Sequence, residues 1–297
     1  MKHAYLILAH NEPKILRILV SLLDDVDNDI YIHIDAKSDF LQFADIGNVC
    51  EKSKCVFLNK RFTVHWGGFS IIKTEMLLFD YAIKNGNYNY FHLMSGVDLP
   101  IKSISYIKSF FEENNGYEFI GFDKIITDNH AQDRIRFRYL FIDYNPRCLS
   151  FITPRLNGLS LRLQNWFKLY REPFVEIKHG SQWCSLSCSF VKYLLSKTQI
   201  IEKIFKYSLC PDELYKQTIL WNSPFREKIY SIDDNLKSSL YEIEWGSNPG
   251  LHPFTFTMKD KERLMMSDQL YARKFSSKHL DIVSYICENL VKHIGNK

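Results

Sequence analysis

The chain has 297 residues, 46% of them hydrophobic and 24% charged, which is the ordinary balance of a globular protein that buries a sizeable core. Its formal net charge of +4 is too small for the strongly basic face of a nucleic-acid-binding protein, so nucleic acid is not an expected partner. Seven irregularly spaced cysteines argue against a zinc site and predict free thiols in a reducing compartment.

The first hundred or so residues alternate between strand and helix patterns. The predicted elements are a strand at 4–10, a helix at 12–25, strands at 29–38 and 55–60, a helix at 71–86 and a strand at 89–100. This order predicts an α/β fold with a mostly parallel central sheet flanked by helices. The first apolar run has about seven residues, too short for a signal peptide or a membrane span, so we expect a cytoplasmic protein.

Polar residues follow three of the predicted strands: His10, the pair Asp35 and Lys37, and Asp98. In parallel sheets, ligands bind beyond the carboxyl ends of the strands, so these residues predict one shared binding site. Each of them taken alone could instead be a helix cap or a turn residue. His33 and Asp35 could ligate a metal, but two ligands are too few to predict one.

The second half of the chain has a less regular pattern. Arg134, Arg136 and Arg138 share one side if residues 133–141 are extended. Residues 159–171 predict an amphipathic helix, rich in basic and aromatic residues, that could rest on a membrane surface or pack on the domain. The remaining predictions are a strand and helix at 180–195, a strand at 241–245, and helices at 258–267 and 277–293.

Two short segments offer catalytic chemistry. In CPDELYKQTI (210–219), Pro211 predicts the first turn of a helix, with Cys210 as N-cap and Glu213 at the third helical position. Glu213 is then either a cap or a carboxylate aimed at a substrate. In YARKF (271–275), Arg273 and Lys274 could present two cations to a diphosphate, or form a surface basic pair. P-loop, dinucleotide-binding, zinc-protease and nucleophile-elbow motifs are absent from the sequence.

Seven segments resemble, in order, the core-2/I-branching β-1,6-N-acetylglucosaminyltransferase family (glycosyltransferase family 14), which includes peptide-O-xylosyltransferases. They are AYLILAH, YIHIDAKS, VHWGGFS, YFHLMSGVDLPIKS, GSQWCSLS, PDELYKQTI and LYARKF. The resemblance covers nearly the whole chain. It implies a single GT-A-like domain over 1–297, with a nucleotide-binding half (1–120) and an acceptor and catalytic half (121–297). It also implies a UDP-sugar donor, inversion at the anomeric carbon and no metal cofactor.

The resemblance also implies roles for individual residues. Glu213 matches the general base, and Lys274 with Arg273 matches the cationic site for the donor diphosphate. The full implied nucleotide-sugar set is His10, Asp35, Lys37, Trp66, Gly67, Asp98, Arg273 and Lys274. The residues implied near the acceptor are Arg138, Tyr139, Trp183 and Trp245.

The chain departs from the family at two points. Where members often carry a basic residue, this chain has Phe254, so Arg273 or a neighbour such as Lys259 has to supply that charge. The membrane anchor and disulfides of the animal enzymes have no counterpart here, which suggests a bacterial member acting at the cytosolic side of the membrane. The acceptor is then a glycan, lipid-linked or free, in surface polysaccharide or lipopolysaccharide assembly. Alternatives are another donor (UDP-xylose, UDP-glucuronate or UDP-galactose) and a non-catalytic glycan- or nucleotide-binding protein.

Overall fold

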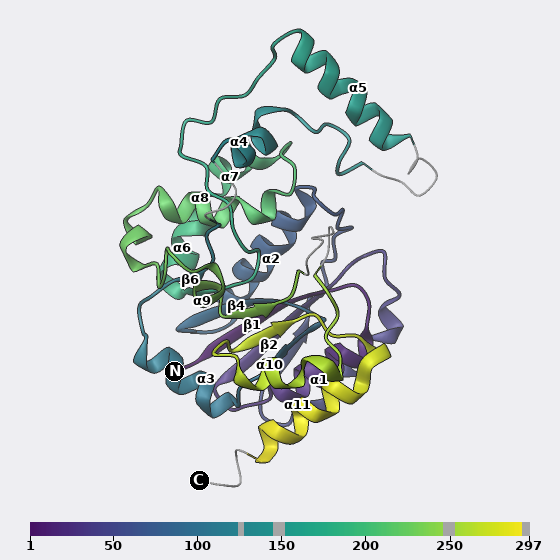
Figure 1. The fold of residues 1–297 in the computed structure, drawn as a ribbon, viewed down its shortest axis with the longest axis vertical. Helices are drawn as coiled ribbons and strands as arrows, with labels where there is room; N and C mark the ends of the chain where they lie inside the picture. Colours follow the sequence, from purple (N-terminus) through teal and green to yellow (C-terminus); the bar gives the residue numbers. More distant parts are fainter. Residues whose placement is uncertain (124–127, 145–151, 246–252, 293–297) are drawn as a thin grey trace.

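The computed structural model describes residues 1–123, 128–144, 152–245 and 253–292. Figure 1 shows a central sheet between two groups of helices. One group contains α2 (Ser70–Asn85), α6 (Cys188–Ser196) and α8 (Tyr215–Trp221), and the other contains α1 (Pro13–Leu22), α10 (Lys261–Met266) and α11 (Leu280–Lys292).

Within the described residues, the central sheet has six strands in the order β3-β2-β1-β4-β7-β6. Their bounds are β1 His3–Ala9, β2 Asn28–Ile34, β3 Lys54–Phe57, β4 Tyr90–Ser95, β6 Phe119–Ile120 and β7 Cys184–Ser187. The first four are parallel, and β7 runs antiparallel to both β4 and β6. Nearly every residue of β1 and β2 is buried, because helices cover both faces, and this explains their continuous apolar sequences. The predicted α/β fold is confirmed.

The sequence predicts a break at Ser95 and Gly96 within the strand at 89–100, and the structure has two strands there. Residues 89–100 form β4, a turn at Gly96, and then β5 (Asp98–Pro100) in a different sheet. The turn brings Gly96 so close to β1 that a Cβ atom there would lie 2.7 Å from Ala9 Cβ. The second sheet has the order β5-β9-β8, with β8 at Tyr241–Ile243 and β9 at Tyr271–Arg273. The sequence analysis missed β9, since three residues are too short for a periodic signal.

The remaining helices connect and cover the sheets. Their bounds are α3 Ile104–Glu113, α4 Asp128–Arg136, α5 Thr153–Trp166, α7 Thr198–Phe205 and α9 Asn235–Ser239. The extended arrangement considered for residues 133–141 is wrong, because α4 is helical as far as Arg136. The helix predicted at 258–267 is a 3-10 turn, Met258–Asp260, followed by α10, and residue 293 of the predicted last helix lies outside the described residues.

No helix in the described part of the chain is long and apolar enough to cross a membrane. Six cysteines are free thiols: Cys50, Cys55, Cys184, Cys188, Cys210 and Cys287. Cys148 lies outside the described residues.

Candidate functional site

A cavity of about 1170 Å³ lies at the carboxyl ends of β1, β2 and β4 and extends to the second sheet. It is lined by most of the residues predicted from the sequence: His10, Asp35, Lys37, Trp66, Gly67, Tyr139, Trp183, Glu213, Trp245, Arg273 and Lys274. Small-molecule pockets usually have volumes of roughly 300–1,000 Å³, so this cavity has room for a nucleotide sugar and part of an acceptor.

The ends of β1 and β2 form one wall. Asp35 is buried and accepts a hydrogen bond from the Lys37 amide at 2.8 Å, and the Lys37 ammonium lies 3.6 Å from its second oxygen. Lys37 Nζ also donates to the carbonyl of Val64 at 2.5 Å. These contacts hold a carboxylate and a cation at the rim of the cavity, beside the exposed His10.

The VHWGG segment connects this wall to the segment that carries Glu213. Gly67 has φ +73°, a conformation that side-chain-bearing residues rarely adopt, and its carbonyl accepts from the Cys210 amide at 2.8 Å. A Cβ atom at Gly67 would lie 3.3 Å from Cys210 Sγ. Trp66, 59% exposed, therefore lies on a loop that is fixed against the residue just before Pro211.

Glu213 is the third residue after the N-cap, as predicted, but the turn that it ends is 3-10 and not α-helical. Residues Pro211–Glu213 form a single 3-10 turn, and α8 begins only at Tyr215. Cys210 occupies the predicted N-cap position, but it has φ 45° and its side chain makes no cap hydrogen bond. Leu214, with φ −121° and ψ −44°, separates the 3-10 turn from the start of α8.

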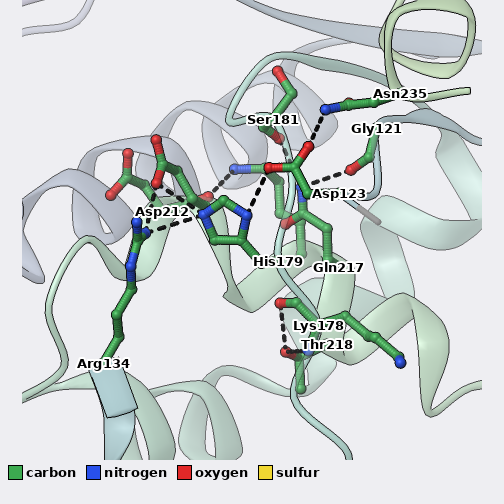
Figure 2. Close-up of polar contacts among 12 residues, drawn as sticks. Gly121, Asp123, Arg134, Lys178, His179, Ser181, Asp212, Gln217, Thr218 and Asn235 are labelled. Atoms are coloured by element: carbon green, nitrogen blue, oxygen red, sulfur yellow. Dashed lines mark hydrogen bonds and ion pairs between the residues drawn. The ribbon is translucent and has the colours of Figure 1, made fainter. Parts of the chain in front are cut away.

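Two donors hold the Glu213 carboxylate instead (Figure 2). Arg134 Nη1, from α4, donates to Glu213 Oε2 at 2.7 Å, and His179 Nε2 lies 3.1 Å from the same oxygen. Burial opposes ionisation, but the hydrogen bonds from His179 and Arg134 outweigh it and lower the pKa of Glu213. Neither contact uses Oε1, so that oxygen is left to accept a proton from a ligand.

His179 is itself oriented by a second carboxylate. Its Nδ1 lies 2.9 Å from Asp123 Oδ2, and Asn235 donates to the other Asp123 oxygen. Burial would lower the pKa of His179, but hydrogen bonds to Asp123 and Glu213 raise it above its ordinary value. His179 thus links the two carboxylates, while the Arg134 charge, whose Nη1 lies 3.1 Å from His179 Nε2, opposes the rise of its pKa.

Sequence reasoning had not assigned Arg134, His179, Asp123 or Asn235 to the site. His179 directly precedes the GSQWCSLS segment, and this position is the one feature of the local sequence that could have assigned it to the site. The close packing there explains Gly180, because a Cβ atom at this position would lie 1.9 Å from the Gly121 carbonyl oxygen. Arg134 belongs to the noted arginine series, but its role depends on a contact across 79 residues.

The second sheet supplies the cations of the opposite wall. Asp98 on β5 is paired in register with Arg273 on β9, and their side chains form an ion pair of 2.7 Å. The Arg273 guanidinium also lies 4.5 Å from the centre of the Trp183 ring. Asp98 is fully buried and does not line the cavity, so it positions Arg273 rather than contacting a ligand as the sequence suggested. Burial, followed by the Arg273 charge, lowers the pKa of Lys274.

Three of the four residues predicted near the acceptor line the cavity, and one does not. Tyr139, Trp183 and Trp245 line the cavity, whereas Arg138 is exposed and does not. Phe254 is 55% exposed, and Lys259 is exposed outside the cavity lining.

A further cation, Lys278, lines the cavity and lies near Arg273 and Lys274 in the sequence. It comes directly after Ser277, whose amide donates to Glu12 at 2.9 Å beside the end of β1. Lys278, rather than Lys259, is therefore placed to supply the charge that Phe254 lacks.

Within the described residues, no group of three or more His, Cys, Asp or Glu side chains is placed to hold a metal ion. Three of the carboxylates that line the cavity, Asp35, Asp123 and Glu213, each contact a cationic or hydrogen-bonding partner from the chain itself.

Comparison with known proteins agrees with the geometry. The family model described as Core-2/I-Branching enzyme matches residues 3–268. The rat protein "Xylosyltransferase 2" is 22% identical over 293 residues, covering 92% of this chain and 32% of the relative. "Xylosyltransferase oxt" of Drosophila melanogaster is 23% identical over 270 residues, covering 82% and 28%. The chain thus spans about a third of the length of these relatives. Apo mouse xyloside xylosyltransferase 1 aligns with a TM-score of 0.40 at 13% identity, covering 91% of this chain and 96% of that one.

Proposed function

The chain belongs to the Core-2/I-branching enzyme family, and we propose that it is an inverting, metal-independent glycosyltransferase. It moves a sugar, N-acetylglucosamine in the leading hypothesis, from a UDP-sugar to a hydroxyl of a glycan acceptor. One observation carries the proposal: the Glu213 carboxylate, whose pKa is lowered and whose donors among the described residues both contact Oε2, shares a cavity with the cations Arg273 and Lys274.

The residues divide the reaction between them. An acceptor hydroxyl has a pKa far above neutrality and needs a base as it attacks. Glu213 Oε1 takes its proton while the hydroxyl oxygen bonds to the anomeric carbon, and the bond from that carbon to the diphosphate oxygen breaks on the opposite face. Lys274 and Arg273 balance the charge on the departing UDP, a contribution of roughly 2–4 kcal/mol for each such group. Arg134 and His179 keep Glu213 ionised and oriented.

UDP-xylose is a second candidate donor, and one observation favours it: the relatives at 22–23% identity are named xylosyltransferases. UDP-glucuronate and UDP-galactose fit the same chemistry, because donor choice depends on the shape of the sugar pocket. We place the acceptor in bacterial surface polysaccharide or lipopolysaccharide assembly, on the cytosolic side. The alternative to an enzyme is a protein that binds a glycan or a nucleotide in this cavity and catalyses no reaction.

Glu213→Gln tests the base. The amide cannot accept the hydroxyl proton, so transfer should fall by at least a thousandfold, while UDP binding should change less than threefold. Transfer is measured as UDP release from UDP-N-acetylglucosamine and UDP-xylose with a panel of glycoside acceptors, and UDP binding by thermal shift. Glu227→Gln, an exposed glutamate away from the cavity, is the matched control and should retain full activity. Unchanged transfer by Glu213→Gln would show that the base is misassigned.

A further inference from the structure

Helix α5 and the turn after it expose an unusual amount of apolar surface. The exposed side chains are Leu156, Leu159, Leu163, Trp166, Phe167, Leu169 and Phe174. Trp166 is 77% exposed and Phe167 is 64% exposed, and their rings stack with centroids 5.5 Å apart. The sequence pattern left open whether this helix packs on the domain, and the structure shows its apolar side chains facing outward. Figure 1 shows α5 projecting from the body.

The leucines and the tryptophan form one stripe. Leu156, Leu159, Leu163 and Trp166 recur at spacings of three, four and three residues, so they lie along a single face of α5. Phe167 extends this face at the end of the helix. Continuous exposed apolar surface of this kind marks a binding site for another molecule or for a membrane.

Charge identifies the partner. Residues 153–174 contain four cations, Arg155, Arg162, Lys168 and Arg171, and a single acidic residue, Glu172. Arg155 and Arg162 are exposed and precede Leu159 and Trp166 by four residues, so they flank the stripe. An apolar face edged with basic residues and aromatic rings is the pattern of a helix that lies in the membrane interface. Pairing of two copies through this face would bring like charges together and is disfavoured.

The helix is fixed to the catalytic body. Gln164 accepts from the Arg138 amide at 2.8 Å and donates to the Arg138 carbonyl at 2.9 Å. Arg171 donates to the carbonyl oxygens of Lys203, at 3.0 Å, and Ile204. Arg138 is next to Tyr139, which lines the cavity. These contacts fix the position of α5 relative to the cavity, so a membrane or protein that binds α5 also has a fixed position relative to the cavity.

We propose that α5 and the turn through Phe174 bind the surface of an anionic phospholipid bilayer. Leu159, Trp166 and Phe167 enter the interface, and Arg155, Arg162 and Lys168 contact the headgroup phosphates. The binding does not depend on the proposed transferase activity. If the chain is also a transferase, membrane binding through α5 places the cavity close to the bilayer surface, where the sugar of a lipid-linked acceptor lies.

Vesicle flotation tests the proposal with purified full chain and no nucleotide sugar. Binding is expected to vesicles of phosphatidylcholine with 30% phosphatidylglycerol and to be at least tenfold weaker to phosphatidylcholine alone. Each charge removed by Arg155→Gln, Arg162→Gln and Lys168→Gln should weaken binding about fivefold. The combined Leu159→Ala, Trp166→Ala and Phe167→Ala variant should bind at least tenfold more weakly.

The control variants make the same kinds of substitution at exposed positions outside α5. Leu41→Ala and Met266→Ala truncate other exposed apolar side chains, and Lys14→Gln, Lys60→Gln and Lys192→Gln remove other exposed cations. These variants should bind as wild type. Three results would overturn the proposal: no binding to anionic vesicles, equal binding to neutral vesicles, or equal losses in the α5 and control variants. Light scattering that shows dimers dispersed by the α5 variants, without vesicle binding, would assign the face to a second copy instead.

Discussion

Glu213 shows how neighbours determine what a single carboxylate can do. Glu213 ends a 3-10 turn and not the first turn of a regular α-helix. Its ionisation depends on Arg134 and His179, which come from distant parts of the chain. A base held this way remains charged at neutral pH but depends on two positioning residues.

Arg134→Gln should move the acid limb of kcat/KM to higher pH. The lowered pKa of Glu213 means that activity is present above that pKa and is lost as the pH falls through it. A hydrogen bond to a charged group contributes about 1.5–3 kcal/mol, so its loss should raise this limb by about one to two pH units. A pH–rate profile measures the shift.

Arg136→Gln is the matched control, since Arg136 is two residues away on α4 but is exposed and lies over the Tyr170 ring. Equal shifts from both arginine variants would mean that general loss of positive charge, and not the bond to Glu213, explains the effect.

Metal independence is also a prediction about individual side chains. With Arg273 and Lys274 as the diphosphate cations, transfer in excess EDTA should equal transfer with added manganese, within about twofold. Strong stimulation by manganese would instead implicate the carboxylate of Asp35 at the cavity.

At the scale of elements, a buried ion pair joins α2 to α8 directly behind the catalytic turn. Lys216 Nζ lies 2.6 Å from Glu75 Oε2, and both side chains are fully buried. Glu75 also accepts from the hydroxyl of Tyr215 at 2.5 Å and from Gln182 at 2.8 Å. This network connects α2, α8 and the segment before β7, and so fixes the helix that follows Glu213.

Lys216→Met should therefore destabilise the fold by about 3 kcal/mol or more, because it leaves the Glu75 charge buried without its cation. The double variant Glu75→Gln, Lys216→Met should recover much of the loss. Urea unfolding measures both. Lys192→Met, an exposed lysine on α6, should cost less than about 0.5 kcal/mol. A double variant no more stable than Lys216→Met would contradict this account.

At the scale of the whole molecule, the cavity draws on both sheets and on loops from both halves of the chain. A ligand that fills it contacts the ends of β1 and β2 together with β9. A ligand bound in this cavity should thus stabilise both sheets together, so that the chain unfolds in a single transition.

UDP at 100 times its Kd should raise the free energy of unfolding by about 2.7 kcal/mol, in one cooperative transition. Lys274→Ala should reduce the shift in Tm, whereas Lys259→Ala, outside the cavity, should leave it unchanged. Two separate transitions, with only one moved by UDP, would contradict the single-domain prediction.

Much of this organisation was predictable from local sequence. Buried runs such as AYLILAH and the apolar spacing of residues 71–86 identify strands and helices, because burial on a regular backbone imposes a period. Polar residues after the strands, His10 and Asp35, could be assigned to one site because parallel strands end at one edge.

Contacts between distant segments were decided only by the tertiary structure. Asp98 was expected at the ligand but is buried against Arg273, and the bond from Arg134 to Glu213 spans 79 residues. The spacing of apolar residues along a helix or strand indicates which of its faces is buried. It does not indicate which other segment packs against that face. The sequence by itself therefore determined the elements and the chemical inventory of this protein. Packing alone decided which carboxylate is held ionised, which cations face the cavity and that the apolar face of α5 stays exposed.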